Sequence, residues 1–258
     1  MIIWAGTSNK DVGMVIEHYP KVIVPRRKVT VQTIPGGNDI VIDEGAFENY
    51  EQEYNVFLDS KRLGGLQTVI PKLSNWLLGN PGYHRLEDSY FPDVYRMAYY
   101  TGGAEFVSVF NEYGEGVLTF NCAPEKYYKM GERPITLLPN AAPSDEGTGY
   151  LINPSVFPAK PTLMITGHGP ITISIDDHKF GEDTTTPVNE RTLTISEIGG
   201  SLTIDIRTHR IYSGDQNKAS VLTGDLDKFV LNKYTRYWMS DNTNDNITVT
   251  IIPRWWTI

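Results

Sequence analysis

"VTVQTIPGGNDIVI", residues 29–42, places a Pro-Gly-Gly-Asn run between two stretches that are rich in β-branched side chains. A phosphate-binding loop needs its Gly-rich turn to lead into a helix, so that free backbone N–H groups and the helix dipole face the anion. Residues 39–42 are instead short and β-branched, and residues 29–34 alternate as a strand does. We therefore predict a β-hairpin that turns at Gly36-Gly37 and binds no phosphate.

One segment of the first half has the spacing of an amphipathic helix. In "TVIPKLSNWLLGNPG", residues 68–82, apolar side chains recur on one helical face, at Val69, Leu73, Trp76 and Leu77. Thr68 is a candidate N-cap, Pro71 is tolerated in the first turn, and Gly79 ends the helix ahead of a proline. We expect a single helix in this half of the chain.

The rest of the first half has strand patterns. Residues 50–58 place their apolar side chains on one side, at Tyr50, Tyr54, Val56 and Leu58. This alternation predicts a half-buried strand. Residues 93–123 predict further consecutive strands, broken at Gly102-Gly103 and again at residues 114–116. We expect them to form an antiparallel meander.

The second half is almost entirely of β type. "PITISI" (170–175), "TLTISEIGGSLTIDI" (192–206) and "NITVTIIPRWWTI" (246–258) alternate isoleucine, leucine or valine with threonine and serine. Short strands separated by Gly turns are typical of a β-sandwich. We expect the segment around Gly199-Gly200 to be a buried hairpin, and the polar run "SDNTNDN" (240–246) to be a hairpin tip.

Residues 131–161 separate the two halves and contain six prolines with little periodicity. We interpret this stretch as a linker and the entry to a second domain. The predicted fold class is mainly β, with two β-sandwich-like domains. The domains span residues 1–134, with the helix, and residues 135–258.

Candidate chemical groups are few. Cys122 is the only cysteine, and in "VLTFNCA" it is the next inward residue after Leu118 and Phe120, so we interpret it as a core thiol. The segment "IDDHKFGED" gathers a set of metal-ligand types in Asp176, Asp177, His178, Glu182 and Asp183. Its spacing matches no ligand template, so a solvated loop is favoured over a metal site.

We predict that the chain is not an enzyme and needs no cofactor or metal. The five histidines lie in unrelated local contexts, and no Gly-x-Ser-x-Gly elbow occurs. A formal net charge of −8 does not favour nucleic-acid binding, which needs a basic excess on one surface. No apolar run approaches the length of a membrane span, so neither membrane insertion nor a signal peptide is expected.

"PRWWTI", at the C-terminal end, places two tryptophans in succession. On a strand, Trp255 and Trp256 face opposite ways, so one can fill a core while the other meets solvent, a neighbouring domain or a partner. We treat both as candidate packing or partner contacts. Packing between domains or subunits is favoured over sugar stacking for the outward one.

Several of these segments together resemble one known family. "VPRRKVTVQTIPGGND", "VYRMAYYTG", "GEGVLTFNCAPEKYY", "NPSVFPAKPTLMITGHGPITISI", "GGSLTIDI" and "IIPRWWTI" follow one another in this order along nearly the whole chain. This succession is similar to that of the distal tail proteins of long-tailed bacteriophages.

The resemblance implies a structural virion protein at the distal end of the phage tail. It implies a hexameric ring made by the N-terminal domain, with the tail tube protein above and the tail-associated hub or lysin protein below. It further implies a galectin-like C-terminal domain that supports receptor-binding proteins, and a lumen through which DNA passes without specific binding. The sugar-binding constellation of galectins is not found in this sequence.

A second hypothesis belongs to a different class of protein. The outer sandwich would be a carbohydrate- or receptor-binding module that recognises a glycan of the host cell wall. A ring-forming hub assembles into closed cyclic oligomers, whereas a binding module works as a monomer or trimer, so the mass in solution discriminates between the two.

Overall fold

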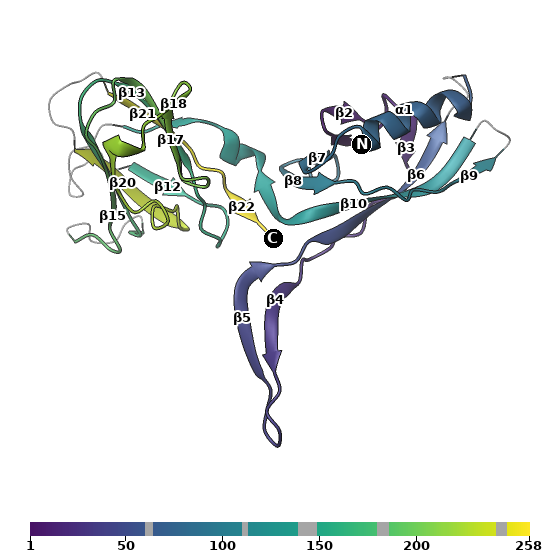
Figure 1. Cartoon of the computed structure of the whole chain (residues 1–258), viewed down its shortest axis with the longest axis horizontal. Coiled ribbons are helices and arrows are strands. Elements are labelled where there is room, and N and C mark those ends of the chain that lie inside the picture. Colours follow the sequence, from purple (N-terminus) through teal and green to yellow (C-terminus); the bar gives the residue numbers. More distant parts are fainter. Residues whose placement is uncertain (60–63, 110–112, 139–148, 180–185, 241–246) are drawn as a thin grey trace. The chain divides into compact units, whose positions relative to one another are not determined.

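The computed structural model describes residues 1–59, 64–109, 113–138, 149–179, 186–240 and 247–258. The chain is mainly β, as predicted, and divides into two compact units (Figure 1). Unit 1 comprises Met1–Lys126 with Ile258, and unit 2 comprises Tyr127–Thr257. The domain boundary between residues 134 and 135 stays a prediction.

Unit 1 is built from one helix and the strands of the first half of the chain. The strands are β1 (Ile2–Trp4), β2 (Thr7–Ser8), β3 (Met14–Ile16), β4 (Arg27–Gln32), β5 (Ile40–Phe47), β6 (Tyr50–Asp59), β7 (His84–Asp88), β8 (Val94–Tyr99), β9 (Phe106–Val109) and β10 (Tyr113–Tyr128). The main sheet has the order β2-β1-β7-β8-β10-β6-β3, and β9 also pairs with β10. Strands β4 and β5 form a separate two-stranded sheet.

The predicted strand over residues 50–58 is confirmed as β6. Its alternate side chains are buried, and they include Gln52, a polar core residue that the apolar pattern did not reveal. The predicted break at residues 114–116 is wrong, because β10 runs through it and Gly116 pairs with Val56. Gly116 serves a close approach: a Cβ there would lie 2.5 Å from the Glu105 carbonyl oxygen.

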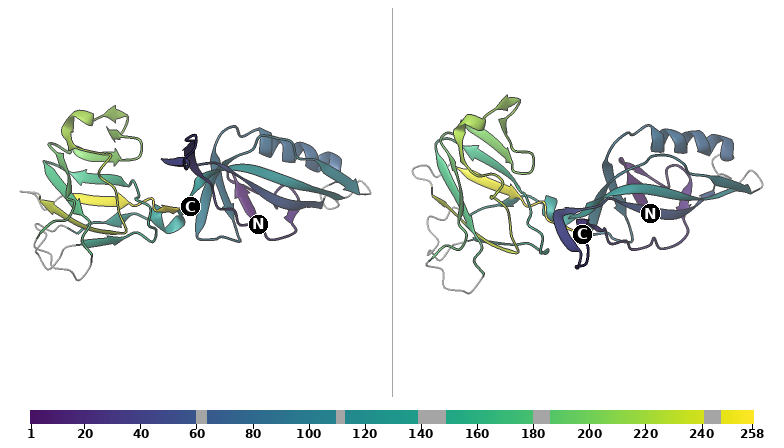
Figure 2. Two further views of the ribbon diagram at one scale, coloured as in Figure 1. Left: turned by 90° about the horizontal axis from the view of Figure 1, so that it is seen from below. Right: turned by 60° about the horizontal axis from the view of Figure 1, so that its bottom comes forward.

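The predicted helix is confirmed as α1 (Leu66–Leu78), which lies along one face of the unit 1 sheet (Figure 2). Thr68 is not its N-cap: Gly65 holds that position, and the Thr68 hydroxyl donates a hydrogen bond to the Gly64 carbonyl oxygen. The buried side of α1 is tied to the sheet, because Trp76 Nε1 donates to the Trp4 carbonyl oxygen at 2.9 Å.

Unit 2 consists of strands and two short 3₁₀ turns. The strands are β11 (Ile135–Thr136), β12 (Gly149–Ile152), β13 (Thr162–Gly167), β14 (Ile171–Asp176), β15 (Arg191–Ile195), β16 (Gly200–Asp205), β17 (Arg210–Ser213), β18 (Gln216–Asn217), β19 (Leu222–Gly224), β20 (Tyr234–Ser240), β21 (Thr248–Ile252) and β22 (Trp256–Thr257), with turns η2 (Lys129–Glu132) and η3 (Ala219–Val221). One sheet has the order β11-β21-β13-β16-β17-β18, and the other has the order β12-β20-β14-β15-β19. Inward side chains of both sheets form one apolar core.

One connection in unit 2 differs from expectation. The segment around Gly199-Gly200 is not a hairpin, because β15 and β16 belong to different sheets, and this segment crosses from one sheet to the other. The predicted hairpin tip at residues 240–246 falls on residues 241–246, which lie outside the described residues, so it stays a prediction. The likeness of unit 2 to galectins stays a prediction.

Candidate functional site

The predicted hairpin at residues 29–42 is confirmed, and it is the most exposed element of unit 1. Strands β4 and β5 pair antiparallel with Thr30 opposite Ile42 and Gln32 opposite Ile40. Gly37 N–H donates to the Ile34 carbonyl oxygen at 3.0 Å across Pro35 and Gly36, and Gly36 has a φ of 78°. This is a type II turn, for which Pro-Gly at the two central positions is well suited, and it is centred on Pro35-Gly36, one residue before the predicted Gly36-Gly37. We call residues 27–47 the arm.

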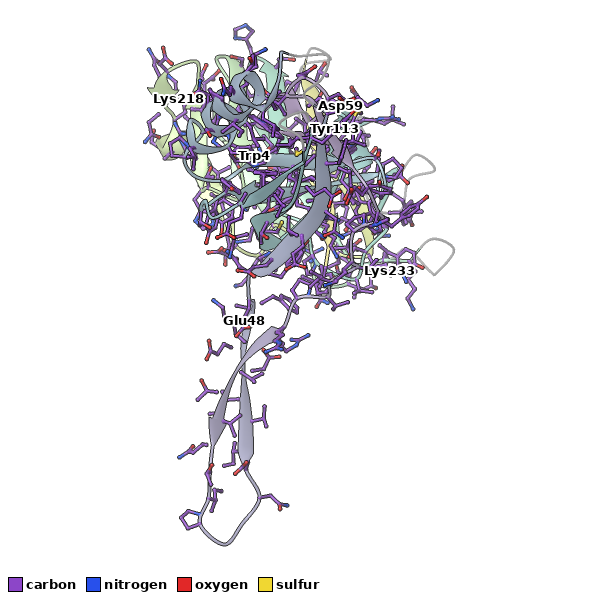
Figure 3. All side chains as sticks on the ribbon, turned by 90° about the vertical axis from the view of Figure 1, so that its right-hand side faces the viewer. Trp4, Glu48, Asp59, Tyr113, Lys218 and Lys233 are labelled. Atoms are coloured by element: carbon purple, nitrogen blue, oxygen red, sulfur yellow. The ribbon has the colours of Figure 1, made fainter. Side chains whose placement is uncertain are left out.

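The arm extends into solvent beyond Glu48, with side chains on both of its faces (Figure 3). Cross-strand pairing places Val29, Val31 and Val41 on one face, and they are 43%, 53% and 63% exposed. Ile40 and Ile42 lie on the other face and are 46% and 49% exposed. An isolated two-stranded ribbon is marginally stable in water, and exposed apolar patches of this kind are typical of interaction surfaces.

Charged and polar contacts hold the base of the arm. Arg27 Nη1 forms an ion pair with Asp43 Oδ2 at 2.6 Å, and the Arg27 guanidinium lies 5.0 Å from the centre of the Phe47 ring. Farther along the arm, Thr30 donates a hydrogen bond to Glu44 Oε1 at 2.7 Å. These contacts hold the two strands together near the base of the ribbon, where their register shifts between Arg27 and Val29.

A second apolar feature of unit 1 is a small groove beside α1. It has a volume of about 160 Å³ and lies between the helix and residues 100–106. Ile70 and Leu78 on its rim are 44% and 62% exposed, and Phe106 forms part of its wall. The groove is too small for a drug-sized ligand, which needs about 300 Å³ or more.

The two tryptophans at the C-terminal end face different surroundings, as their succession on a strand predicts. Trp255 is 5% exposed and belongs to the core of unit 2. Trp256 is half-buried: its ring stacks on Phe157 with centroids 4.7 Å apart, and its Nε1 donates to the Pro158 carbonyl oxygen. Both therefore pack within unit 2, and contact of Trp256 with a partner stays a prediction.

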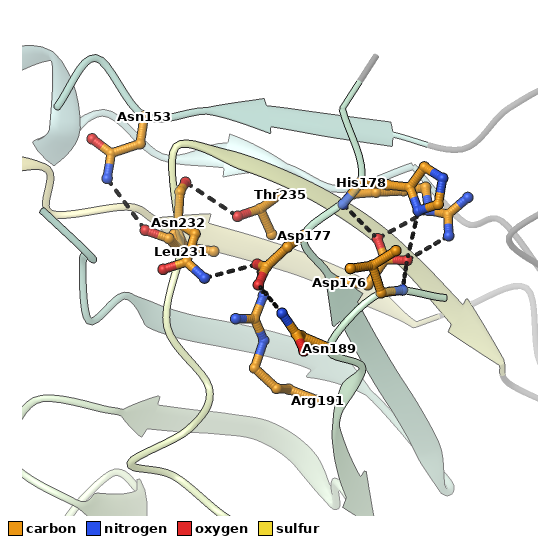
Figure 4. Close-up of polar contacts among 11 residues, drawn as sticks. Asn153, Asp176, Asp177, His178, Asn189, Arg191, Leu231, Asn232 and Thr235 are labelled. Carbon is orange, nitrogen blue, oxygen red and sulfur yellow. Dashed lines mark hydrogen bonds and ion pairs between the residues drawn. The ribbon is translucent and has the colours of Figure 1, made fainter. Parts of the chain in front are cut away.

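Two of the candidate metal ligands, Asp176 and His178, interact with other groups of the protein (Figure 4). Asp176 is fully buried and forms a two-point ion pair with Arg236, and its carboxylate also accepts the Val188 N–H. His178 Nδ1 lies 3.5 Å from Asp176 Oδ2. With these contacts the group fastens strand β14 to β20, and it is not the solvated loop that the sequence favoured.

The neighbouring Asp177 is engaged in the same way. It accepts hydrogen bonds from Arg191 Nη2 at 2.6 Å, Asn232 Nδ2 at 2.8 Å and Asn189 Nδ2 at 3.2 Å. Glu182 and Asp183 lie outside the described residues. Across the described ranges, no three His, Cys, Asp or Glu side chains gather where a metal ion could bind.

Cys122 is a core thiol, as predicted. It is fully buried in unit 1, and burial raises the pKa of its thiol to about 12. A thiol with a raised pKa is a poor nucleophile, because the thiolate is the reactive form. The absence of catalysis stays a prediction. In the part of the chain that the structure describes, no helix has the length and apolar character to cross a bilayer.

The arm is the candidate functional site. The sequence predicted its hairpin but not its exposure, because alternation is usually a sign that one face is buried. The signal that was missed is the presence of valine and isoleucine on both faces of the paired strands. A hairpin that is solvated on one face carries polar side chains there.

Fold and site together define a class: a two-unit, mainly β protein with an exposed apolar arm. Among solved structures, the SPP1 Dit (gp 19.1) protein, described as a paradigm of the hub adsorption apparatus in phages that infect Gram-positive hosts, has this fold. The TM-score is 0.72 at 14% identity, and the match covers 100% of this chain and 98% of that chain. The mainly β fold implied by the family resemblance is thereby confirmed, and the galectin-like second domain stays a prediction.

Two further solved structures, both of the phage p2 baseplate in its activated conformation, have TM-scores of 0.45 and 0.42 at 9% identity. Each match covers 93% of this chain and 90% of that chain. No protein-family profile matches the chain, and no curated protein sequence matches it.

Proposed function

We propose that this protein is a structural component of a phage tail, a hub at the distal end of the tail tube. It acts as a hexameric ring made by unit 1 and catalyses no reaction. The observation that carries the proposal is the arm, whose apolar side chains are exposed on both faces in a single chain. An element of this kind becomes stable when an assembly covers it.

The shared fold with SPP1 Dit over the whole length of both chains supports the same proposal. In the proposed assembly, the ring joins the tail tube protein on one side to the tail-associated hub or lysin protein on the other. Unit 2 supports receptor-binding proteins on the outside of the virion. Its half-buried Trp256, whose ring stacks on Phe157, is the candidate contact.

The mass of the assembly in solution tests the proposal. We expect mass photometry to give six times the 29.0 kDa chain mass, or a multiple of that assembly, and negative-stain images to show a ring with a central hole. A mass of one chain, both alone and with the tail tube protein of the same phage, would refute the ring. The same result, with binding to host cell-wall glycan, would favour the carbohydrate-binding hypothesis.

A substitution in the arm separates assembly from folding. Val31→Asp places a charge on an apolar face that the assembly covers, so the concentration needed for assembly should rise about tenfold or more. Val156→Asp is the matched control, because Val156 is 73% exposed and lies in unit 2. The far-UV circular dichroism of both variants should equal that of the natural protein.

We also propose that DNA passes through the ring without being held. The chain has 31 acidic and 23 basic residues. Basic side chains that line a channel bind the phosphates of DNA, so DNA moves more easily through a channel that lacks them. The assembled ring should therefore fail to retard duplex DNA in a gel at low ionic strength. Retardation that weakens steeply with added salt would contradict this proposal.

A further inference from the structure

The arm has two free edges as well as two exposed faces. Strand β4 pairs only with β5 and β5 only with β4 among the described strands. The outer edge of each strand therefore presents backbone N–H and C=O groups that another strand can pair with. Natural proteins usually cover or block such edges, so an open edge on both sides of an apolar ribbon points to strand pairing with a further chain.

The two strands carry opposite charge that the arm does not itself neutralise. Lys28 on β4 and Glu44 on β5 are exposed, and neither forms an ion pair within the described ranges. Arg27 and Asp43, by contrast, neutralise each other. Alternate residues of a strand share a face. Thr30 pairs with Ile42 and its hydroxyl donates to Glu44, so Glu44 lies on the face of Thr30. Alternation along β4 places Lys28 on this face as well, beside the register shift between Arg27 and Val29.

We propose that β5 of one copy of this chain pairs with β4 of the next copy, so that the arms join side by side into one continuous sheet. Arms related by rotation about a ring axis point the same way. The β5 strand of one copy and the β4 strand of the next then run antiparallel. Glu44 of one copy then lies beside Lys28 of the next.

This pairing uses two different edges of the same chain, so it is a heterologous contact of the type that closes into rings. Side-by-side arms also bring their valine faces next to each other, which removes apolar surface from water. The inference rests on the proposed ring and names the contact between its copies.

Charge reversal tests the pairing. Lys28→Glu makes both edges acidic, and Glu44→Lys makes both edges basic, so each variant repels its own copies. At low salt, each variant should need a protein concentration about threefold or more above that of the natural protein to assemble. An equimolar mixture should recover the natural concentration dependence, because every acidic edge then meets a basic one in an alternating ring. Recovery by mixing cannot come from a role in folding.

Two results would overturn the pairing. One is that the single variants assemble as the natural protein does. The other is that they are impaired and the mixture is equally impaired. Both positions are exposed, and circular dichroism with thermal unfolding will establish that each variant folds before it is mixed.

Disulfide formation gives a second, independent measurement. A chain with Thr30→Cys, mixed with a chain carrying Ile42→Cys, should form covalent dimers on mild oxidation, since the two positions face each other across the proposed pair. Ile40→Cys, mixed with Thr30→Cys in the same way, tests a register that is shifted by two residues. Each variant alone should form few dimers, because equivalent positions are two strand spacings, about 9–10 Å, apart, beyond disulfide reach. The natural Cys122 is buried, so it should not form a disulfide in this experiment.

The two failures can be told apart. A ring of the expected mass without cross-linked dimers refutes the pairing of arms and leaves the proposed function standing. Cross-linked dimers without a ring support the pairing and refute the hexamer. Neither ring nor dimers, with the tail tube protein present, refutes both.

Discussion

Asp176 and Arg236 form a two-point ion pair in unit 2, and both side chains are fully buried. Asp176 is the last residue of β14 and Arg236 lies opposite it on β20. The Arg236 guanidinium also lies 5.6 Å from the centre of the Trp238 ring. A buried pair of this kind is not a source of large net stability, but the loss of one partner leaves an unpaired charge in the core.

We expect Asp176→Asn to lower the free energy of unfolding of unit 2 by about 3–5 kcal/mol, because Arg236 then keeps a buried charge without its counter-charge. Denaturant unfolding followed by Trp fluorescence measures the change. Asp176→Asn combined with Arg236→Met should recover part of the loss. Asp225→Asn is the control, since its ion pair with Lys228 is exposed, and it should leave the transition unchanged. Equal effects of both aspartate substitutions would contradict the structural role of Asp176.

The turn of the arm gives a prediction about local order. Gly36 has a φ of 78°, which costs a residue with a Cβ about 1–2 kcal/mol. We expect Gly36→Ala to speed amide hydrogen exchange across β4 and β5 by about fivefold or more, with no change in the rest of unit 1. Asn38→Ala, in the same loop, is the control. An unaltered exchange rate in Gly36→Ala would show that the turn does not set the order of the arm.

The hairpin and the helix could be predicted because their signals are local. Pro35-Gly36 suits a type II turn wherever it stands, and the spacing of Val69, Leu73 and Trp76 buries one face of α1 as expected. The N-cap was missed because Gly65 satisfies that position with backbone alone, and no side chain marks it.

The paths of the strands could not be predicted in the same way. Strands β15 and β16 alternate like the two halves of a hairpin, yet they lie in opposite sheets, because a Gly-Gly turn permits a crossover as readily as a hairpin. The pairing partner of a strand is set by residues far away in the sequence. The same holds for Asp176, whose partner Arg236 lies 60 residues away and leaves no local trace.

Cys122 should be unreactive in the folded protein. Burial raises the pKa of its thiol to about 12, so at pH 8 its reaction with a thiol reagent should be about a thousandfold slower than that of an exposed cysteine. Val156→Cys supplies the exposed thiol for comparison in the same chain. Unfolding in guanidinium should make both thiols react at one rate. Rapid labelling of Cys122 in the native protein would show that the core of unit 1 opens more readily than its packing indicates.

Unit 1 should lose stability in alkali because of its buried tyrosines. Burial raises the pKa of Tyr50 above its usual range, and that of Tyr54 still more clearly, so the folded state keeps these phenols neutral. In the unfolded state they ionise near pH 10, and the stability held below that pH is lost as the pH rises further. We expect the free energy of unfolding to fall above pH 10 by up to about 1.4 kcal/mol per pH unit for each tyrosine.

Tyr50→Phe should make this slope shallower by one tyrosine's contribution, whereas Tyr19→Phe, at a residue that is 83% exposed, should leave it unchanged. Unfolding curves at pH 9, 10 and 11 measure the slope, and equal slopes for the natural protein and Tyr50→Phe would contradict the assignment.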